Sequence, residues 1–146
     1  MGVGYGRLVD SHDYWLATTW PDGRLHVMPV WGLWHAESFW FSSSGRSRKA
    51  LNLAADPRCV VSTDNPREPV VIEGVAERVI DLATLATILD LENAKYATTY
   101  TMELFDPQVN ACLRVRRGWA FGIAQGGLND SPTRWTFGGS TASPTL

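Results

Sequence analysis

The stretch that decides the fold is YWLATTWPDGRLHVMPVWGLW, residues 14–34. Aromatic and β-branched residues fill its first part, 14–20, and are typical of a β-strand. Pro21-Asp22-Gly23-Arg24 is a strong turn signal, and the strand pattern resumes from Leu25 to Trp34. The stretch therefore predicts a β-hairpin. Because Pro29 lacks a backbone donor, we expect the second strand to lie at a sheet edge or to carry a bulge.

Strand and turn signals continue to alternate along the rest of the chain. Helical spacing occurs twice, at about 47–55, where Asp56-Pro57 ends it, and from 82 to about 96. Asp81 precedes the second helix and is its predicted N-cap. Further strands are expected at 38–43, 58–64, 68–80, 111–124 (as one or two strands) and 133–137.

The order of these elements favours a mostly antiparallel sheet, because most strands follow one another without a crossover helix. About six strands in a small domain favour a closed barrel, which leaves no exposed edge. We therefore expect a mainly β, α+β fold with two or three helices and six or more mostly antiparallel strands. Residues 1–137 are predicted to form a single domain and the small, polar residues 138–146 a flexible tail.

Composition excludes several classes of protein. Of 146 residues, 45% are apolar and 19% are charged, which can supply a core and argues against wholesale disorder. A net charge of -2 excludes a broadly basic nucleic-acid-binding surface. No apolar run approaches the ~18 residues of a membrane helix, and residues 1–14 lack the apolar stretch of a secretory signal. We expect a protein of the reducing cytoplasm with neither a nucleic-acid nor a membrane partner.

The sharpest local feature is Ser42-Ser43-Ser44-Gly45-Arg46-Ser47-Arg48-Lys49, between a predicted strand and a predicted helix. Three cations gather at the start of a helix, where the backbone dipole already places partial positive charge. A bound phosphate would resolve this conflict, because free N–H groups, serine hydroxyls and cationic heads all favour an anion. The alternative is a solvated basic turn with serine caps.

Other polar residues give weaker signals. The three histidines have no metal-ligand spacing and the two cysteines lie far apart, so we expect no metal site. Glu73 and Glu77 are interpreted as outward strand carboxylates, and the basic run 114–117 as a solvated strand face. Most of the seven tryptophans are expected in a core or a dimer contact, and one or two are candidates for lining the pocket of a flat ligand.

Several segments, taken in order, resemble the pyridoxamine 5'-phosphate oxidase-like split β-barrel superfamily. Within it, the chain looks most like actinobacterial flavin/deazaflavin oxidoreductases that use coenzyme F420. The segments are 14–19, 21–24, 26–31, 39–42, 47–50, 52–53, 56–58 and 73–76, with 133–137 matching a closing motif.

The resemblance implies a split β-barrel that forms a homodimer with two equivalent sites at the subunit interface. The cofactor-binding residues that it implies are Val27, Met28, Pro29, Val30, Ser42, Ser43, Ser47, Arg48 and Lys49. The first four lie beside the isoalloxazine or deazaflavin ring, the last three hold the cofactor phosphate, and the first two serines occupy a strand end that assists them.

The leading hypothesis is an F420-dependent oxidoreductase, working as a reductase, that moves a hydride between the deazaflavin and a small or planar organic substrate. One alternative is an FMN-dependent enzyme of the same fold, and another is a non-catalytic cofactor-binding or heme/tetrapyrrole-binding protein. No catalytic residue is assigned, and Tyr96, Tyr100 and a solvent water are the candidate proton donors. Vitamin B6 oxidation is not expected, since 134–137 replaces the Arg-Leu-His-Asp-Arg segment of the true oxidases.

Overall fold

The computed structural model describes residues 2–123 and 132–136, and the side chains of 6–122. The tail predicted at 138–146 lies outside these residues. The elements are α1 (Gly2–Asp10), β1 (Asp13–Thr19), β2 (Leu25–Trp31), β3 (Leu33–His35), β4 (Ser38–Ser44), α2 (Arg48–Ala55), β5 (Arg58–Thr63), β6 (Val70–Arg78), α3 (Leu82–Tyr96), the 3-10 helix η1 (Met102–Phe105), β7 (Asn110–Ile123) and β8 (Pro132–Thr136).

The strands form one antiparallel sheet in the order β2-β1-β5-β6-β7-β4-β3, with β8 beside β7. The predicted hairpin is confirmed: β1 pairs with β2 over their whole length, and Trp15 lies opposite Pro29. β2 is an edge strand of this path, as Pro29 predicted. The expected fold class, mainly β with helices in an α+β arrangement, is likewise confirmed.

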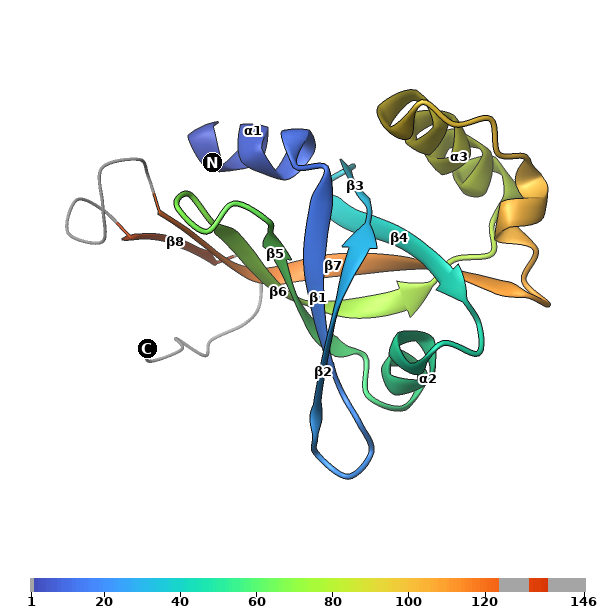
Figure 1. Cartoon of the computed structure of the whole chain (residues 1–146), viewed down its shortest axis with the longest axis horizontal. Helices are drawn as coiled ribbons and strands as arrows, with labels where there is room; N and C mark the ends of the chain where they lie inside the picture. The colour runs from blue at the N-terminus through green and yellow to red at the C-terminus, as the bar shows by residue number, and fades with distance from the viewer. Residues whose placement is uncertain (1, 124–131, 137–146) are drawn as a thin grey trace.

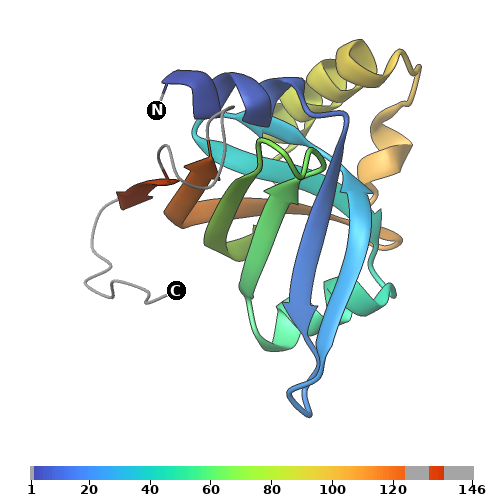
Figure 2. The ribbon, with the colours of Figure 1, turned by 60° about the vertical axis from the view of Figure 1, so that its left-hand side comes forward.

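A single residue, Gly32, joins the two ends of the sheet. β2 ends at Trp31 and β3 begins at Leu33, yet these are the first and last strands of the path. The sheet must therefore curl back on itself, and Figure 2 shows this curvature. Because β2 and β3 do not pair in the described part of the chain, the result is a split barrel with a seam at Gly32.

The prediction of one continuous strand over 25–34 is wrong at this seam, because the chain must leave one sheet edge and join the other. Only glycine fits there. A Cβ on Gly32 would overlap the ring of Phe39 and lie 2.9 Å from the carbonyl oxygen of Trp40. Strand residues on either side gave no sign of the break, since they share the same aromatic and β-branched character.

Two hydrophobic clusters stabilise the barrel. The first fills its interior and the second packs under α3, where the apolar residues Leu85, Ile88 and Leu89 face the sheet. The fully buried members of the first cluster are Leu8, Tyr14, Leu16, Phe39, Val61, Ile72, Val115 and Ala120. Both clusters come from the period-2 and period-3.6 spacings of the sequence.

Helix α1 was not predicted. Its glycines, at 2, 4 and 6, give it a low helix propensity, so tertiary contacts must hold it. Leu8 is fully buried in the barrel core, and the hydroxyl of Tyr14 donates a hydrogen bond to its carbonyl oxygen. α1 and α3 lie at one end of the barrel, while α2 lies near the other end, close to the β1–β2 turn (Figures 1 and 2).

The two predicted helix starts are confirmed. Ser47 caps α2, and its hydroxyl accepts a hydrogen bond from the N–H of Ala50. Asp81 caps α3, and its carboxylate accepts from the N–H of Thr84 at 2.9 Å. α2 is therefore fixed directly after β4, and its N-terminus opens beside the end of that strand.

Candidate functional site

The serines predicted at the strand end meet the start of α2. Ser43, on β4, donates a hydrogen bond from its hydroxyl to Oγ of Ser47 at 2.9 Å. Ser42 precedes it on the same strand and is half-buried. The short turn between β4 and α2 thus places hydroxyl groups and the first helical N–H groups at one point of the surface.

Three cations, Arg46, Arg48 and Lys49, surround this point without a carboxylate partner among residues 6–122. The first turn of α2 also lacks acidic residues. Positive charge at a helix N-terminus is unfavourable unless an anion accompanies it. The sequence predicted a phosphate ligand for Ser47, Arg48 and Lys49, and a cationic helix start without acidic residues is compatible with that prediction.

The β1–β2 hairpin reaches the same point. The guanidinium carbon of Arg48 lies 3.9 Å from the ring centroid of Trp20, which follows β1. Arg48 also donates to Oδ1 of Asn52 at 3.4 Å, and the fully buried Asn52 donates in turn to Oγ1 of Thr18 at 3.0 Å. These contacts tie α2 to β1 and to the residue that follows it, so the predicted phosphate residues lie next to the first strand of the hairpin.

The four predicted ring-binding residues divide between the two faces of β2. Val27 and Pro29 lie on the outer face of the barrel, because they pair with Ala17 and the exposed Trp15. Val30 is buried in the core, so only its backbone could reach a ligand, and Met28 is 42% exposed at the open edge. Among the described strands β2 pairs only with β1, so its outer row of N–H and C=O groups is left for a ligand by the described part of the sheet.

The outer face around β2 is apolar. Trp15, Leu25, Val27 and Trp31 share this face, and each is between 42% and 77% exposed. Large exposed apolar side chains that gather in one patch mark a surface that another molecule covers. We call these four residues the outer patch.

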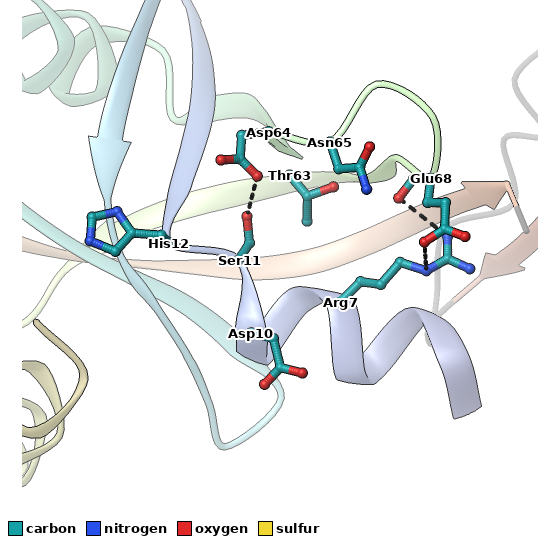
Figure 3. Close-up of a pocket in the computed structure, with 8 residues that line it drawn as sticks. All are labelled: Arg7, Asp10, Ser11, His12, Thr63, Asp64, Asn65 and Glu68. Carbon is teal, nitrogen blue, oxygen red and sulfur yellow. Dashed lines mark hydrogen bonds and ion pairs between the residues drawn. The ribbon is translucent and has the colours of Figure 1, made fainter. Parts of the chain in front are cut away.

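The pocket in Figure 3 is lined by several carboxylates, in contrast to the cationic start of α2. It measures about 240 Å³ and lies beside the end of α1. Asp64 accepts a hydrogen bond from the hydroxyl of Ser11, and Glu68 lies 3.8 Å from Nε of Arg7. Asp10 also lines it. This concentration of carboxylates makes the pocket a poor site for an anionic cofactor.

Of the candidate proton donors, Tyr96 is committed to the fold. Its hydroxyl bonds to the backbone of Gly32 and of His12, and burial raises its pKa to about 12. Tyr100, by contrast, is 45% exposed. Both cysteines are buried, and burial raises the pKa of each thiol to about 12. The structure therefore gives neither Tyr96 nor the cysteines an accessible reactive group.

The basic run on β7 differs from its predicted role. Arg114 pairs with Glu77, and Arg117 pairs with Glu37 at 3.1 Å, so the interpretation as a solvated face is wrong for these two arginines. Glu77 lies opposite Arg114 across the β6–β7 pair, and Glu37 lies in the turn between β3 and β4. Arg116 also contacts Glu77, at 3.1 Å, but 64% of its side chain stays exposed, as expected for a solvated face.

Residues 6–122 contain no group of three or more histidine, cysteine or acidic side chains that could hold a metal ion. No helix in the described part of the chain has the length and apolar character needed to cross a membrane.

Comparison with known proteins agrees with this architecture. A protein described as an F420 reductase is 28% identical, with a TM-score of 0.63 over 80% of this chain and 95% of that one. A conserved hypothetical protein of Mycobacterium tuberculosis is 27% identical, with a TM-score of 0.72 over 97% of this chain and 95% of that one.

A heme-binding protein of Mycobacterium smegmatis shares the fold at 22% identity, with a TM-score of 0.66 over 89% of this chain and 55% of that one. No protein of curated function matches the sequence. The family model for pyridoxamine 5'-phosphate oxidase matches residues 8–119, which include the hairpin, the seam and α2. The chain therefore belongs to the pyridoxamine 5'-phosphate oxidase family, whose fold is the split β-barrel described above.

Proposed function

We propose that the protein is an F420-dependent oxidoreductase, working as a reductase on a small or planar organic substrate. The observation that carries this proposal is the cluster of Arg46, Arg48 and Lys49 at the start of α2. These cations lack carboxylate partners within residues 6–122, and Arg48 lies against Trp20 of the β1–β2 hairpin. Membership of the family and the 28% identity to an F420 reductase support the choice of cofactor.

The residues of this chain fit such a cofactor. Arg48 and Lys49 would bind its phosphate, helped by the hydroxyls of Ser43 and Ser47 and by the first N–H groups of α2. The open edge of β2 offers backbone N–H and C=O groups to the polar edge of a planar ring, and Val27 and Pro29 offer it apolar contact.

The cofactor, when bound, supplies the hydride chemistry. The protein's part is to orient the ring, to exclude water from it and to leave room for the substrate. This division explains why the described residues around α2 and β2 include no acid–base pair. The proton that completes the reduction would come from solvent or from the exposed Tyr100.

The outer patch supports a homodimer in which a second copy covers the ring-binding strand. Trp15 and Trp31 alone leave 46% and 42% of their surface exposed in the single chain. Burying such residues against an equal surface removes apolar area from water at about 25 cal/mol per Å². A dimer would also enclose the open edge of β2, which one barrel cannot do by itself.

An FMN-dependent reaction is the second candidate, because a cationic helix start binds either phosphate group equally well in principle. The two are separated by an anaerobic assay with each reduced cofactor and a panel of planar acceptors. In this assay we expect oxidation of reduced F420 only when an acceptor is added. In a separate aerobic sample without acceptor, we expect reduced F420 to remain stable. Turnover with reduced FMN and none with reduced F420 would overturn it.

A further inference from the structure

Two guanidinium groups from different segments converge on the indole ring of Trp20. The guanidinium carbon of Arg48, on α2, lies 3.9 Å from the ring centroid, and that of Arg24, in the β1–β2 turn, lies 4.4 Å from it. Both distances are within the range of a cation–π contact. Trp20 thus connects Arg48 of α2 to Arg24 at the tip of the hairpin.

The convergence brings like charges together without full compensation. Arg24 donates from Nε to the carboxylate of Asp22 at 2.8 Å, which leaves its terminal nitrogens without a carboxylate partner among residues 6–122. Arg48 has only the neutral amide of Asn52 at 3.4 Å. Two cations that share one ring, and only one carboxylate, leave a net positive charge that a second anionic group of a ligand can neutralise.

We propose that Trp20 is a positioning residue for Arg48 and that Arg24 is a further cation of the cofactor site. The site would then select a ligand that carries a second anionic group beyond its phosphate. This inference rests on the proposed function, since it assumes a phosphate at the start of α2. F420, which has carboxylates beyond its phosphate, meets the requirement, whereas FMN ends in a single phosphate.

Stacking explains why an aromatic residue is needed at position 20. An arginine side chain has several rotatable bonds, and an unrestrained one loses conformational entropy when it binds a ligand. The flat indole ring packs against the guanidinium of Arg48, and Asn52 accepts a hydrogen bond from the same guanidinium on the helix side. The cation is therefore oriented before the anion arrives.

The test measures dissociation constants of F420 and FMN for Trp20→Leu, Trp20→Phe and Arg24→Gln. Loss of the stack in Trp20→Leu should raise the dissociation constant of F420 about threefold to fivefold. Trp20→Phe keeps an aromatic ring and should recover most of the lost affinity. Arg24→Gln should raise the dissociation constant of F420 about fivefold and that of FMN less than about twofold. The matched control is Arg67→Gln, which removes an exposed cation from the β5–β6 turn and should change neither constant.

A double-mutant cycle separates positioning from a merely structural role. If Trp20 acts through Arg48, then Trp20→Leu should add little to the effect of Arg48→Gln, so the two changes are non-additive. Full additivity, or wild-type affinity in both Trp20→Leu and Arg24→Gln, would overturn the inference while leaving the proposed function intact. If the wild-type protein binds neither cofactor, both fail together. Misfolding of Trp20→Leu would not leave the inference untested, because Arg24→Gln alters only an exposed side chain and probes the same cluster independently.

Discussion

The phenolic oxygen of Tyr96 lies 2.8 Å from the backbone nitrogen of Gly32 and 2.9 Å from its carbonyl oxygen. One side chain at the end of α3 therefore satisfies both polar groups of the residue at the barrel seam. Lys95 adds two bonds from its ammonium group, to the carbonyl oxygen of Gly32 at 2.8 Å and to the hydroxyl of Tyr14 at 2.7 Å. The seam is held by α3 rather than by pairing between β2 and β3.

Replacing Gly32 with alanine should destabilise the protein by about 2 kcal/mol or more, because the new Cβ would overlap the buried ring of Phe39. Urea unfolding measures the free energy of unfolding. The control is Gly118→Ala, whose Cβ would lie an ordinary 3.7 Å from the nearest atom, the carbonyl oxygen of Glu73, and should cost less than about 1 kcal/mol. Equal stability of the two variants would contradict the conclusion that only glycine fits at position 32.

Stability should rise with pH in the range where Lys95 loses its proton. Burial lowers the pKa of Lys95 from 10.5 to about 8, against the opposing influence of nearby aspartates. Between these values the unfolded chain holds a proton that the native protein has released. Unfolding therefore takes up a proton, and the free energy of unfolding increases with pH.

The variant Lys95→Met isolates this effect, since methionine cannot titrate. The stability difference, wild type minus variant, should grow between about pH 7.5 and about pH 9.5 in urea unfolding. Buried Tyr14 and Tyr96 have raised pKa values and oppose the trend only at higher pH. A difference that stays constant or shrinks over that range would show that Lys95 does not titrate as its surroundings require.

The outer patch predicts a dimer. Size-exclusion chromatography with light scattering should give twice the chain mass of 16.2 kDa. Trp15→Glu puts a charge in the middle of the patch and should yield monomers, because an unpaired charge is costly to bury. Leu82→Glu is the control: Leu82 is 72% exposed at the start of α3, and this change should leave the mass unaltered. A wild-type monomer that still binds cofactor tightly would contradict the assignment of the outer patch as a dimer interface.

The cations of α2 predict a loss of cofactor affinity rather than a loss of chemistry. Lys49→Ala and Arg48→Ala should each raise the dissociation constant about tenfold, as a charge-assisted contact is worth ~1.5–3 kcal/mol. At saturating cofactor the hydride-transfer rate, followed by stopped flow, should remain close to that of the wild type. If Lys49→Ala abolished hydride transfer and kept the same affinity, Lys49 would be a catalytic acid instead.

Local signals in the sequence account for most of the fold. The Pro21–Arg24 turn, the cap at Asp81 and the edge character of Pro29 each depend on a few neighbouring residues, and the structure bears them out. α1 and the break at Gly32 depend on distant partners, namely the barrel core around Leu8 and the ring of Phe39. Such contacts override propensity and leave no local pattern.

The candidate site divides in the same way. The serines and cations of 42–49 were visible because they conflict with the helix dipole. The sequence places Trp20 at the end of a predicted strand and Arg24 in the turn signal that follows, and neither position indicates a role in the site. Arg24 and Arg48 meet on the ring of Trp20 because the hairpin packs against α2. This packing leaves no local pattern in the sequence.

A parallel titration of the purified protein with F420, FMN, FAD and heme determines which cofactor the cationic site binds. Quenching of tryptophan fluorescence would give each dissociation constant, at low salt and again at high salt. We predict that F420 binds most tightly and that added salt weakens its binding, since cations at the start of α2 attract its anionic groups. Tighter binding of FMN or heme, or F420 binding that is absent or indifferent to salt, would contradict it.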